Sequence, residues 1–219
     1  MLRSSIAALA LVVAGTAVAC KRSEPQPPPP VSDVELRTDR QRVLTGTVGT
    51  GKFESQATYV LVDANNTGPR DLLVTLRGNL VDDRGRPAGR LLAQSLRVPA
   101  GGMRMFALVD DQSAARPSAI GAEIEIAGAL VPEYEPPVIV TDGRVDIDSD
   151  RAVAQGYVVN TAQRAVKVIV IAGFYDGEGN PLKRPSTQLE IDGGEKRGVQ
   201  LVGPPGSKSA YLFVGEYGY

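Results

Sequence analysis

The sequence predicts an all-β protein in which two tandem antiparallel β-sandwich domains follow a signal peptide and a proline-rich tether. Apolar residues alternate with a period of two along most of the chain, and no long segment has the 3.6-residue period of an amphipathic helix. Gly, Pro and Asp interrupt this alternation at intervals of about 8 to 12 residues, and the second half of the chain repeats the first. The predicted segments are the signal peptide 1–19, the tether 20–33, the first sandwich 34–131 and the second sandwich 138–219.

The N-terminus has the features of an export signal. Arg3 is followed by a nearly uninterrupted apolar run at residues 6–14 and by small residues up to Ala19. This run is too short to cross a bilayer core of about 30 Å. Residues 17–19 satisfy the small-x-small rule of an ordinary signal peptidase, but the next residue is Cys20, the sole cysteine. The residues alone therefore leave two cleavage chemistries open, one giving a secreted protein and one giving a lipid-anchored protein.

The run of small residues, the cysteine and the polar Pro-rich tract resemble the lipobox of bacterial lipoproteins. The match departs from the family pattern at Ala17, where the family prefers Leu. The resemblance implies that Cys20 becomes an acylated N-terminus, whose palmitate-type chains hold the protein on a membrane. Lys21 follows the cysteine, and in the same group this implies delivery to the outer membrane of the bacterial cell envelope.

The tether links this anchor to the folded part. Residues 21–33 read KRSEPQPPPPVSD and contain four consecutive prolines, Pro27–Pro30. Such a segment favours the extended polyproline II conformation, which rises about 3.1 Å per residue. We expect it to hold the first sandwich about 40 Å from the anchor.

An internal duplication becomes visible when the chain is compared with itself at a shift of 94 residues. There are seven identities in the 22 positions from Asn66 to Pro87, against one or two expected by chance at roughly 7% per position. The matched pairs are Asn66/Asn160, Thr67/Thr161, Arg70/Arg164, Val74/Val168, Asp82/Asp176, Gly85/Gly179 and Pro87/Pro181. The match continues at a shift of 93, and Pro132–Pro137 form a stiff joint between the two copies.

Each copy has the pattern of short strands joined by tight turns. Alternating apolar residues predict half-buried strands at 72–80 and 166–174. These strands end at Asp82–Gly85 and Asp176–Gly179, where Asp can bond the turn backbone and Gly can take a positive φ. Further hairpins turn at Gly101–Gly102 and Gly193–Gly194, and the last strands contain Ile124/Ile126 and Leu212/Val214.

The second copy resembles the FxLYD family of small Ig-like β-sandwich domains. The residues that carry the resemblance are Gly156, Val158 and Asn160, then Phe174-Tyr175-Asp176-x-x-Gly179, then Leu189 and Gly193-Gly194. The signature is contracted to Phe-Tyr-Asp here, and it becomes Leu80-Val81-Asp82 in the degenerate first copy. The resemblance covers residues 151–214 and, through the repeat, 57–126. It implies no catalytic residues, an extracytoplasmic location, and a binding or structural role.

Composition excludes several classes of chemistry. The chain has no His, no Trp and one Cys, which excludes Ser/His/Asp and Cys/His catalysis, His-ligated metals, Cys-ligated zinc and an intrachain disulfide. A net charge of −1 provides no basic field for nucleic acid. A hydrolase that uses two carboxylates stays open by composition, although nothing marks a particular pair. We expect neither enzymatic activity nor a cofactor.

Three motifs suggest ligands, and each has a simpler explanation. Asp146, Asp148 and Asp150 alternate as in the opening of a calcium loop, but Arg151 and Tyr157 stand where an EF-hand needs Gly and Glu. The alternatives are an open calcium site and a solvated acidic turn. Residues 46–52 fit the first seven positions of a phosphate-binding loop, yet we interpret them as a Gly-rich turn before a strand. Residues 207–209, Ser-Lys-Ser, suggest a Ser/Lys nucleophile, which needs a buried neutral lysine, but they lie in a Gly/Pro loop that we expect to be exposed.

Aromatic residues gather near the C-terminus. Four of them share one parity, namely Tyr211, Phe213, Tyr217 and Tyr219, while Leu212 and Val214 hold the other. In the first copy, Glu123 and Glu125 align with Tyr211 and Phe213. We therefore predict an aromatic outer face that is covered by a domain interface or by a partner.

These observations lead to one functional hypothesis and one alternative. We expect a non-catalytic lipid-anchored envelope protein that binds the membrane through acylated Cys20 and presents both sandwiches to a protein or an envelope polymer. The alternative is an extracytoplasmic module that binds calcium or a small ligand.

Overall fold

The computed structural model describes residues 33–49, 52 and 54–218. The signal peptide, Cys20, the prolines of the tether and Tyr219 lie outside these residues. The predicted all-β fold is confirmed, because the described residues form antiparallel strands and one short 3₁₀ turn, η2 (Thr38–Arg40). Within 33–49, 52 and 54–218, no helix has the length and apolar character needed to cross a bilayer.

The first sandwich contains strands β1 to β7. Their bounds are β1 Val34–Leu36, β2 Arg42–Val48, β3 Ser55–Asn66, β4 Leu72–Val81, β5 Pro87–Val98, β6 Met103–Val109 and β7 Gly121–Leu130. In one sheet β3 is central, with β1 and β2 on one edge and β6 on the other. In the second sheet β4 lies between β5 and β7.

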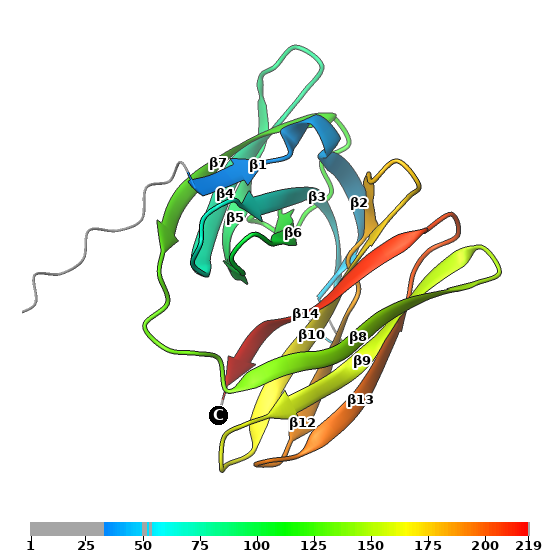
Figure 1. The fold of residues 1–219 in the computed structure, drawn as a ribbon. Helices are drawn as coiled ribbons and strands as arrows, with labels where there is room; N and C mark the ends of the chain where they lie inside the picture. The colour runs from blue at the N-terminus through cyan, green and yellow to red at the C-terminus, as the bar shows by residue number, and fades with distance from the viewer. Residues whose placement is uncertain (1–32, 50–51, 53, 219) are drawn as a thin grey trace, which may run out of the picture.

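The second sandwich contains strands β8 to β14 and repeats this topology (Figure 1). Their bounds are β8 Val138–Asp148, β9 Arg151–Asn160, β10 Val166–Tyr175, β11 Pro181–Lys183, β12 Ser186–Ile191, β13 Lys196–Val202 and β14 Ser209–Gly218. One sheet has the order β8-β9-β13, and in the other β10 lies between β11/β12 and β14. The strand pairings of the two halves therefore correspond, in agreement with the sequence duplication, with β8 in the place of β1 and β2 and with β11 and β12 in the place of β5.

The hydrophobic cores follow the predicted alternation. In β4 the apolar residues of one parity are buried, and these are Leu72, Val74, Leu76 and Leu80. In β10 the equivalent positions Val166, Val168, Val170, Ala172 and Phe174 are buried in the second sandwich. β10 also buries Ile171 and Tyr175, which have the opposite parity. The expectation of a half-buried strand was therefore wrong for β10, because the first sandwich covers its outer face.

The repeated Asn-Thr pair fastens the loop that follows β3 in the first copy and β9 in the second. Asn66 and Asn160 are fully buried, and each side-chain amide donates to backbone carbonyls across the loop. Asn160 donates to Arg164 at 2.8 Å and to Ile191 at 3.0 Å. Each asparagine also accepts a bond from the backbone two residues later. These identities in the repeat are therefore structural.

The repeated Asp-x-x-Gly turns form as predicted. The carboxylate of Asp82 accepts bonds from the backbone N–H groups of Arg84 and Arg86, both at 2.9 Å. Asp176 accepts the equivalent bonds from Glu178 and Asn180. Gly85 and Gly179 have φ values of 71° and 81°, which an L side chain rarely adopts.

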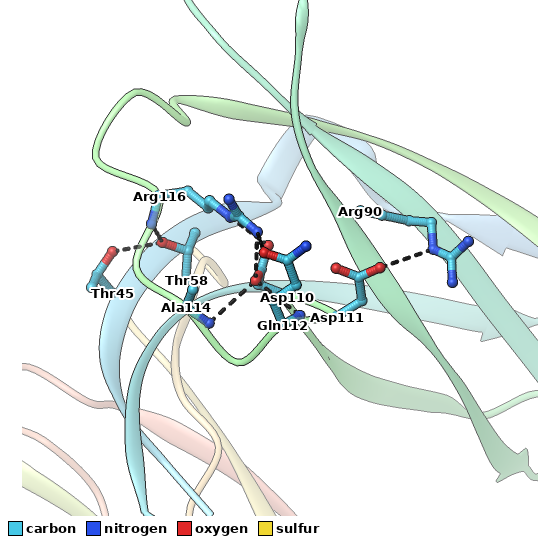
Figure 2. A network of polar contacts seen from close by, with 8 residues as sticks. All are labelled: Thr45, Thr58, Arg90, Asp110, Asp111, Gln112, Ala114 and Arg116. Atoms are coloured by element: carbon cyan, nitrogen blue, oxygen red, sulfur yellow. Dashed lines mark hydrogen bonds and ion pairs between the residues drawn. The ribbon is translucent and has the colours of Figure 1, made fainter.

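A buried polar network pins the connection between β6 and β7 (Figure 2). Asp110 is fully buried and its carboxylate accepts bonds from the guanidinium of Arg116, at 2.8 Å and 3.2 Å. Although burial opposes ionisation, these bonds and two backbone N–H groups hold the pKa of Asp110 below its usual value. The backbone N–H of Arg116 donates to Thr58, whose hydroxyl also bonds Thr45. This long loop is therefore fixed to the first sandwich.

Candidate functional site

The outer face of the sheet that contains β10 and β14 packs against the first sandwich (Figure 1). Leu61 and Met105 of the first sandwich form a buried cluster with Tyr175 of the second. Ile171 and Phe213 belong to the buried cluster of the first sandwich, although the second sandwich supplies them. The two domains thus share hydrophobic core, which fixes their relative position.

A glycine permits this close packing. A Cβ atom placed on Gly173 would lie 3.2 Å from both Cβ and Cε of Met105. Any larger residue in this position of β10 would push against β6, so the absence of a side chain on Gly173 permits this contact between the domains.

One buried hydrogen bond crosses the interface between the domains and joins a phenol to a carboxylate. The hydroxyl of Tyr175 donates to Oδ1 of Asp63 at 2.7 Å, and both residues are buried. Burial raises the pKa of Asp63 to about 6, and the hydrogen bond from Tyr175 only partly offsets this effect. Burial and the neighbouring carboxylate likewise raise the pKa of Tyr175.

Phe213 occupies the centre of the interface between two arginines. The guanidinium carbon of Arg104 lies 4.9 Å from the ring centroid, and that of Arg184 lies 5.9 Å from it. Nε of Arg184 donates to the carbonyl of Met105 at 2.8 Å, while its Nη2 is buried with no hydrogen-bond partner among the described residues. Burial lowers the pKa of Arg184 to about 10 and also lowers that of Arg104.

A groove of about 520 Å³ runs along the margin of this interface. The first sandwich contributes β4 and β5, the second contributes β8 and β14, and the joint contributes Pro132, Tyr134 and Pro136. Its apolar lining includes the exposed side chains of Leu73 and Ile139. Arg104 reaches the groove from β6.

The rim of the groove carries a chain of ion pairs. Nε of Arg97 lies 2.8 Å from Asp71, and its Nη2 lies 2.6 Å from Glu135 in the joint. Burial opposes ionisation of Asp71, yet bonds from the backbone N–H of Ala100 and from Arg97 hold its pKa below the usual value. These bonds connect the interdomain joint to β5.

The predicted aromatic surface is divided among several environments. Phe213 is only 2% exposed, because the first sandwich covers most of its side chain. Tyr211 is 51% exposed, and its ring meets that of Tyr175 edge-on at 5.7 Å. Tyr219 and Cys20 lie outside the described residues.

Tyr217 does not share the face of Phe213, contrary to the prediction from parity. The register of β14 against β10 shifts between Val214 and Glu216, which makes Gly215 a bulge. Beyond this bulge Tyr217 pairs with the buried Val168 and its side chain lines the groove. A one-residue bulge exchanges the two faces of a strand, and the alternation alone did not reveal it.

The acidic alternation has partners other than a metal. Asp150 lies 2.7 Å from Nζ of Lys208 and accepts a bond from the backbone of Gly206. Asp146 accepts a bond from Gln155 and lies 3.5 Å from Arg144. In the part of the chain that the structure describes, no group of three acidic, His or Cys residues could hold a metal ion.

The remaining motifs have structural roles. Gly46 to Val48 belong to β2, so the predicted turn begins only at Gly49, and Ser55 starts the strand β3. Ser207 is fully buried, so the expectation of exposure was wrong for this residue, while Lys208 and Ser209 are exposed. The Oγ of Ser207 accepts a bond from the backbone of Ala152 and donates to the carbonyl of Pro204, which folds the loop onto β9.

Sequence reasoning did not identify Asp63, Arg104 or Arg184 as interface residues. Arg104 was visible only as a residue repeated at Arg197, which in the structure bonds Glu195 on the surface. The positions acquire their roles through docking of the two domains, which the strand pattern does not encode.

Comparison with models of protein families and with curated proteins gave no match for this chain. Among solved structures, the chain is similar to the crystal structure of red sea bream transglutaminase, with 15% sequence identity and a TM-score of 0.23. The match covers 75% of this chain and 27% of that chain, so this chain spans about a quarter of the transglutaminase.

Proposed function

We propose that the chain is a non-catalytic, lipid-anchored protein of a bacterial envelope, whose two Ig-like β-sandwiches bind a protein or an envelope polymer. The resemblance of the segment around Cys20 to a lipobox supports the anchor, and Lys21 supports an outer-membrane location. The interdomain groove is the single structural observation that supports the binding role.

The groove has the size and chemistry expected of a binding site. Its volume of about 520 Å³ lies within the range of roughly 300–1,000 Å³ that is usual for ligand sites. An apolar lining with a few polar groups supplies both contact area and orientation. Both domains and the joint contribute to it, and the shared core keeps them in fixed positions.

Metabolic labelling with radioactive palmitate tests the anchor. We expect the full chain, expressed in a bacterial host with its signal peptide, to incorporate label at the envelope. The Cys20→Ala variant should lose the label and leave the membrane fraction. Labelling that persists in Cys20→Ala would refute acylation at this residue.

Chemical crosslinking in intact envelopes tests the binding role. Tyr217→Ala removes an aromatic side chain that lines the groove and is 44% exposed. Tyr157→Ala is the matched control, because Tyr157 is 45% exposed but lies on β9 and does not line this groove. We expect crosslinked products to diminish for Tyr217→Ala alone. Equal yields from both variants would count against the groove as the binding surface.

A further inference from the structure

The outer edge of β14 has no strand beside it. β14 pairs with β10 along one edge, and no described residue pairs with its other edge. The same holds for β8, which pairs only with β9 among the described strands. β8 and β14 are neighbours without a ladder between them. Consecutive residues of both strands, Leu212–Gly215 and 138–140, line the groove, which therefore follows two open edges.

The equivalent edge of the first sandwich, in β7, also has no strand beside it among the described residues, but a side chain covers part of it. Nε2 of Gln41 donates to the carbonyl of Ala122 in β7 at 2.7 Å. β7 also carries Glu123 and Glu125, which are exposed charges of the kind that protect an edge against strand addition. In β14 the corresponding residues are Tyr211 and Phe213. The duplicated edge that borders the groove has thus lost this charge protection.

Of the two edges in the groove, β14 is the better suited to accept a strand. Asp142 in β8 has a φ of 52°, and the register of β8 shifts between Thr141 and Arg144. Such a bulge bends the edge and interrupts pairing. β14 runs without a charged residue from Ala210 to Gly215.

Arg104 adds a positive charge to the groove, and the carboxylate of Asp71 compensates it only at a distance, without an ion pair. No carboxylate of the described residues lies within 4.0 Å of its guanidinium, whereas Arg97 nearby has two. Its one side-chain hydrogen bond among these residues runs from Nη1 to the adjacent carbonyl of Met103 at 2.9 Å. Arg104 stacks on Phe213 and lines the groove, so its remaining donors suit a carboxylate from an occupant.

We propose that the groove binds an extended peptide, which adds as a strand to the free edge of β14 and places a carboxylate on Arg104. This inference rests on the proposed binding function and specifies its ligand class. Strand addition satisfies the main-chain groups of the edge, while alternate side chains enter the apolar groove and give specificity. The uncharged stretch Ala210–Gly215 is six residues, about 20 Å at 3.3 Å per residue, so a peptide of roughly six residues fits.

A fluorescein-labelled, C-terminally amidated peptide of alternating Val and Thr that ends in Glu is the probe, so that the Glu side chain supplies its only carboxylate. It is added to the full mature chain in detergent, and fluorescence anisotropy measures its affinity. We expect saturable binding that falls about tenfold or more when alternate peptide amides are N-methylated, because strand addition needs these donors. Hydrogen exchange should slow in β14 and not in β7.

Removing the charge of Arg104, or that of the final residue of the peptide, tests whether the two charges pair. Arg104→Gln should weaken the Glu-ended probe about tenfold and leave a Gln-ended probe nearly unchanged. Arg90→Gln is the control, since Arg90 pairs with Asp111 on the surface of the first sandwich. Equal losses for both probes would refute the role of Arg104.

The outcomes separate this inference from the proposed function. Absence of probe binding, binding indifferent to N-methylation, or protection confined to β8 would overturn strand addition to β14. If Tyr217→Ala still reduced crosslinking in envelopes, the binding role would stand with another ligand class, such as a glycan. If neither the probe nor the crosslinking responded, both proposals would fail.

Discussion

The hydroxyl of Tyr175 in the second sandwich donates a 2.7 Å hydrogen bond to the carboxylate of Asp63 in the first. Both groups are buried, so water cannot replace a lost partner without rearrangement. Tyr175→Phe removes the donor, and we expect the free energy of unfolding to fall by about 1–3 kcal/mol. Urea unfolding measures this change. Tyr211→Phe is the control because the Tyr211 ring is exposed, and equal stability of the wild type and Tyr175→Phe would contradict the prediction.

The same pair predicts a dependence of stability on pH. The pKa of Asp63 is about 6 in the folded protein against an ordinary value of 3.8, so the folded state holds the proton more tightly. The resulting stabilisation is complete below pH 3.8, declines as the pH rises to about 6, and is absent above that pH. At 1.36 kcal/mol per pKa unit, its upper limit is about 3 kcal/mol.

The Asp63→Asn variant isolates this effect from the other carboxyl groups. The difference in the free energy of unfolding between wild type and Asp63→Asn should decline from pH 4 to pH 6 and stay constant above pH 7. A difference that does not vary with pH would show that Asp63 has an ordinary pKa.

Close packing at Gly173 predicts a steric effect. Gly173→Val places methyl groups against Met105 in the interface between the domains, and we expect a loss of about 1–3 kcal/mol in stability. Gly128→Val in β7 is the matched control, because a Cβ atom there meets no other atom within 4 Å. Thermal unfolding of both variants measures the contrast, and equal melting temperatures would refute it.

The buried asparagines predict equal roles in the two copies. Asn160→Ala and Asn66→Ala each leave several buried backbone groups without partners, so each should lower the free energy of unfolding by about 1–3 kcal/mol. Gln200→Ala, at an exposed position of β13, should change it by less than about 0.5 kcal/mol. Urea unfolding measures these changes. A small effect at only one of the two asparagines would contradict the prediction that they have equal roles.

The sequence predicted those features that local chemistry determines. Alternation located β4 and β10, and the Asp82 and Asp176 turns formed because Asp and a following Gly satisfy the turn backbone by themselves. The repeat in sequence corresponds to a repeat in strand pairing.

The prediction failed where two distant segments meet. Ile171 and Tyr175 are buried only because β3 and β6 cover them, and the face of Tyr217 depends on a bulge at Gly215 that has no sequence signature beyond the glycine. The groove combines β4, β5, β8 and β14, so its existence depends on the interdomain angle, which alternation does not specify.

The hydrogen bonds of Asp33 indicate at which end of the molecule the tether joins the folded part. The carbonyl of Asp33 accepts bonds from the backbone and hydroxyl of Thr67, and Asp71, four residues further on, lines the groove. The point where the tether joins the folded body is therefore linked to the rim of the groove by the short segment 67–71. If Cys20 is acylated as we propose, a tether of about 40 Å would separate the lipid surface from this end of the groove, rather than from the far end of the second domain.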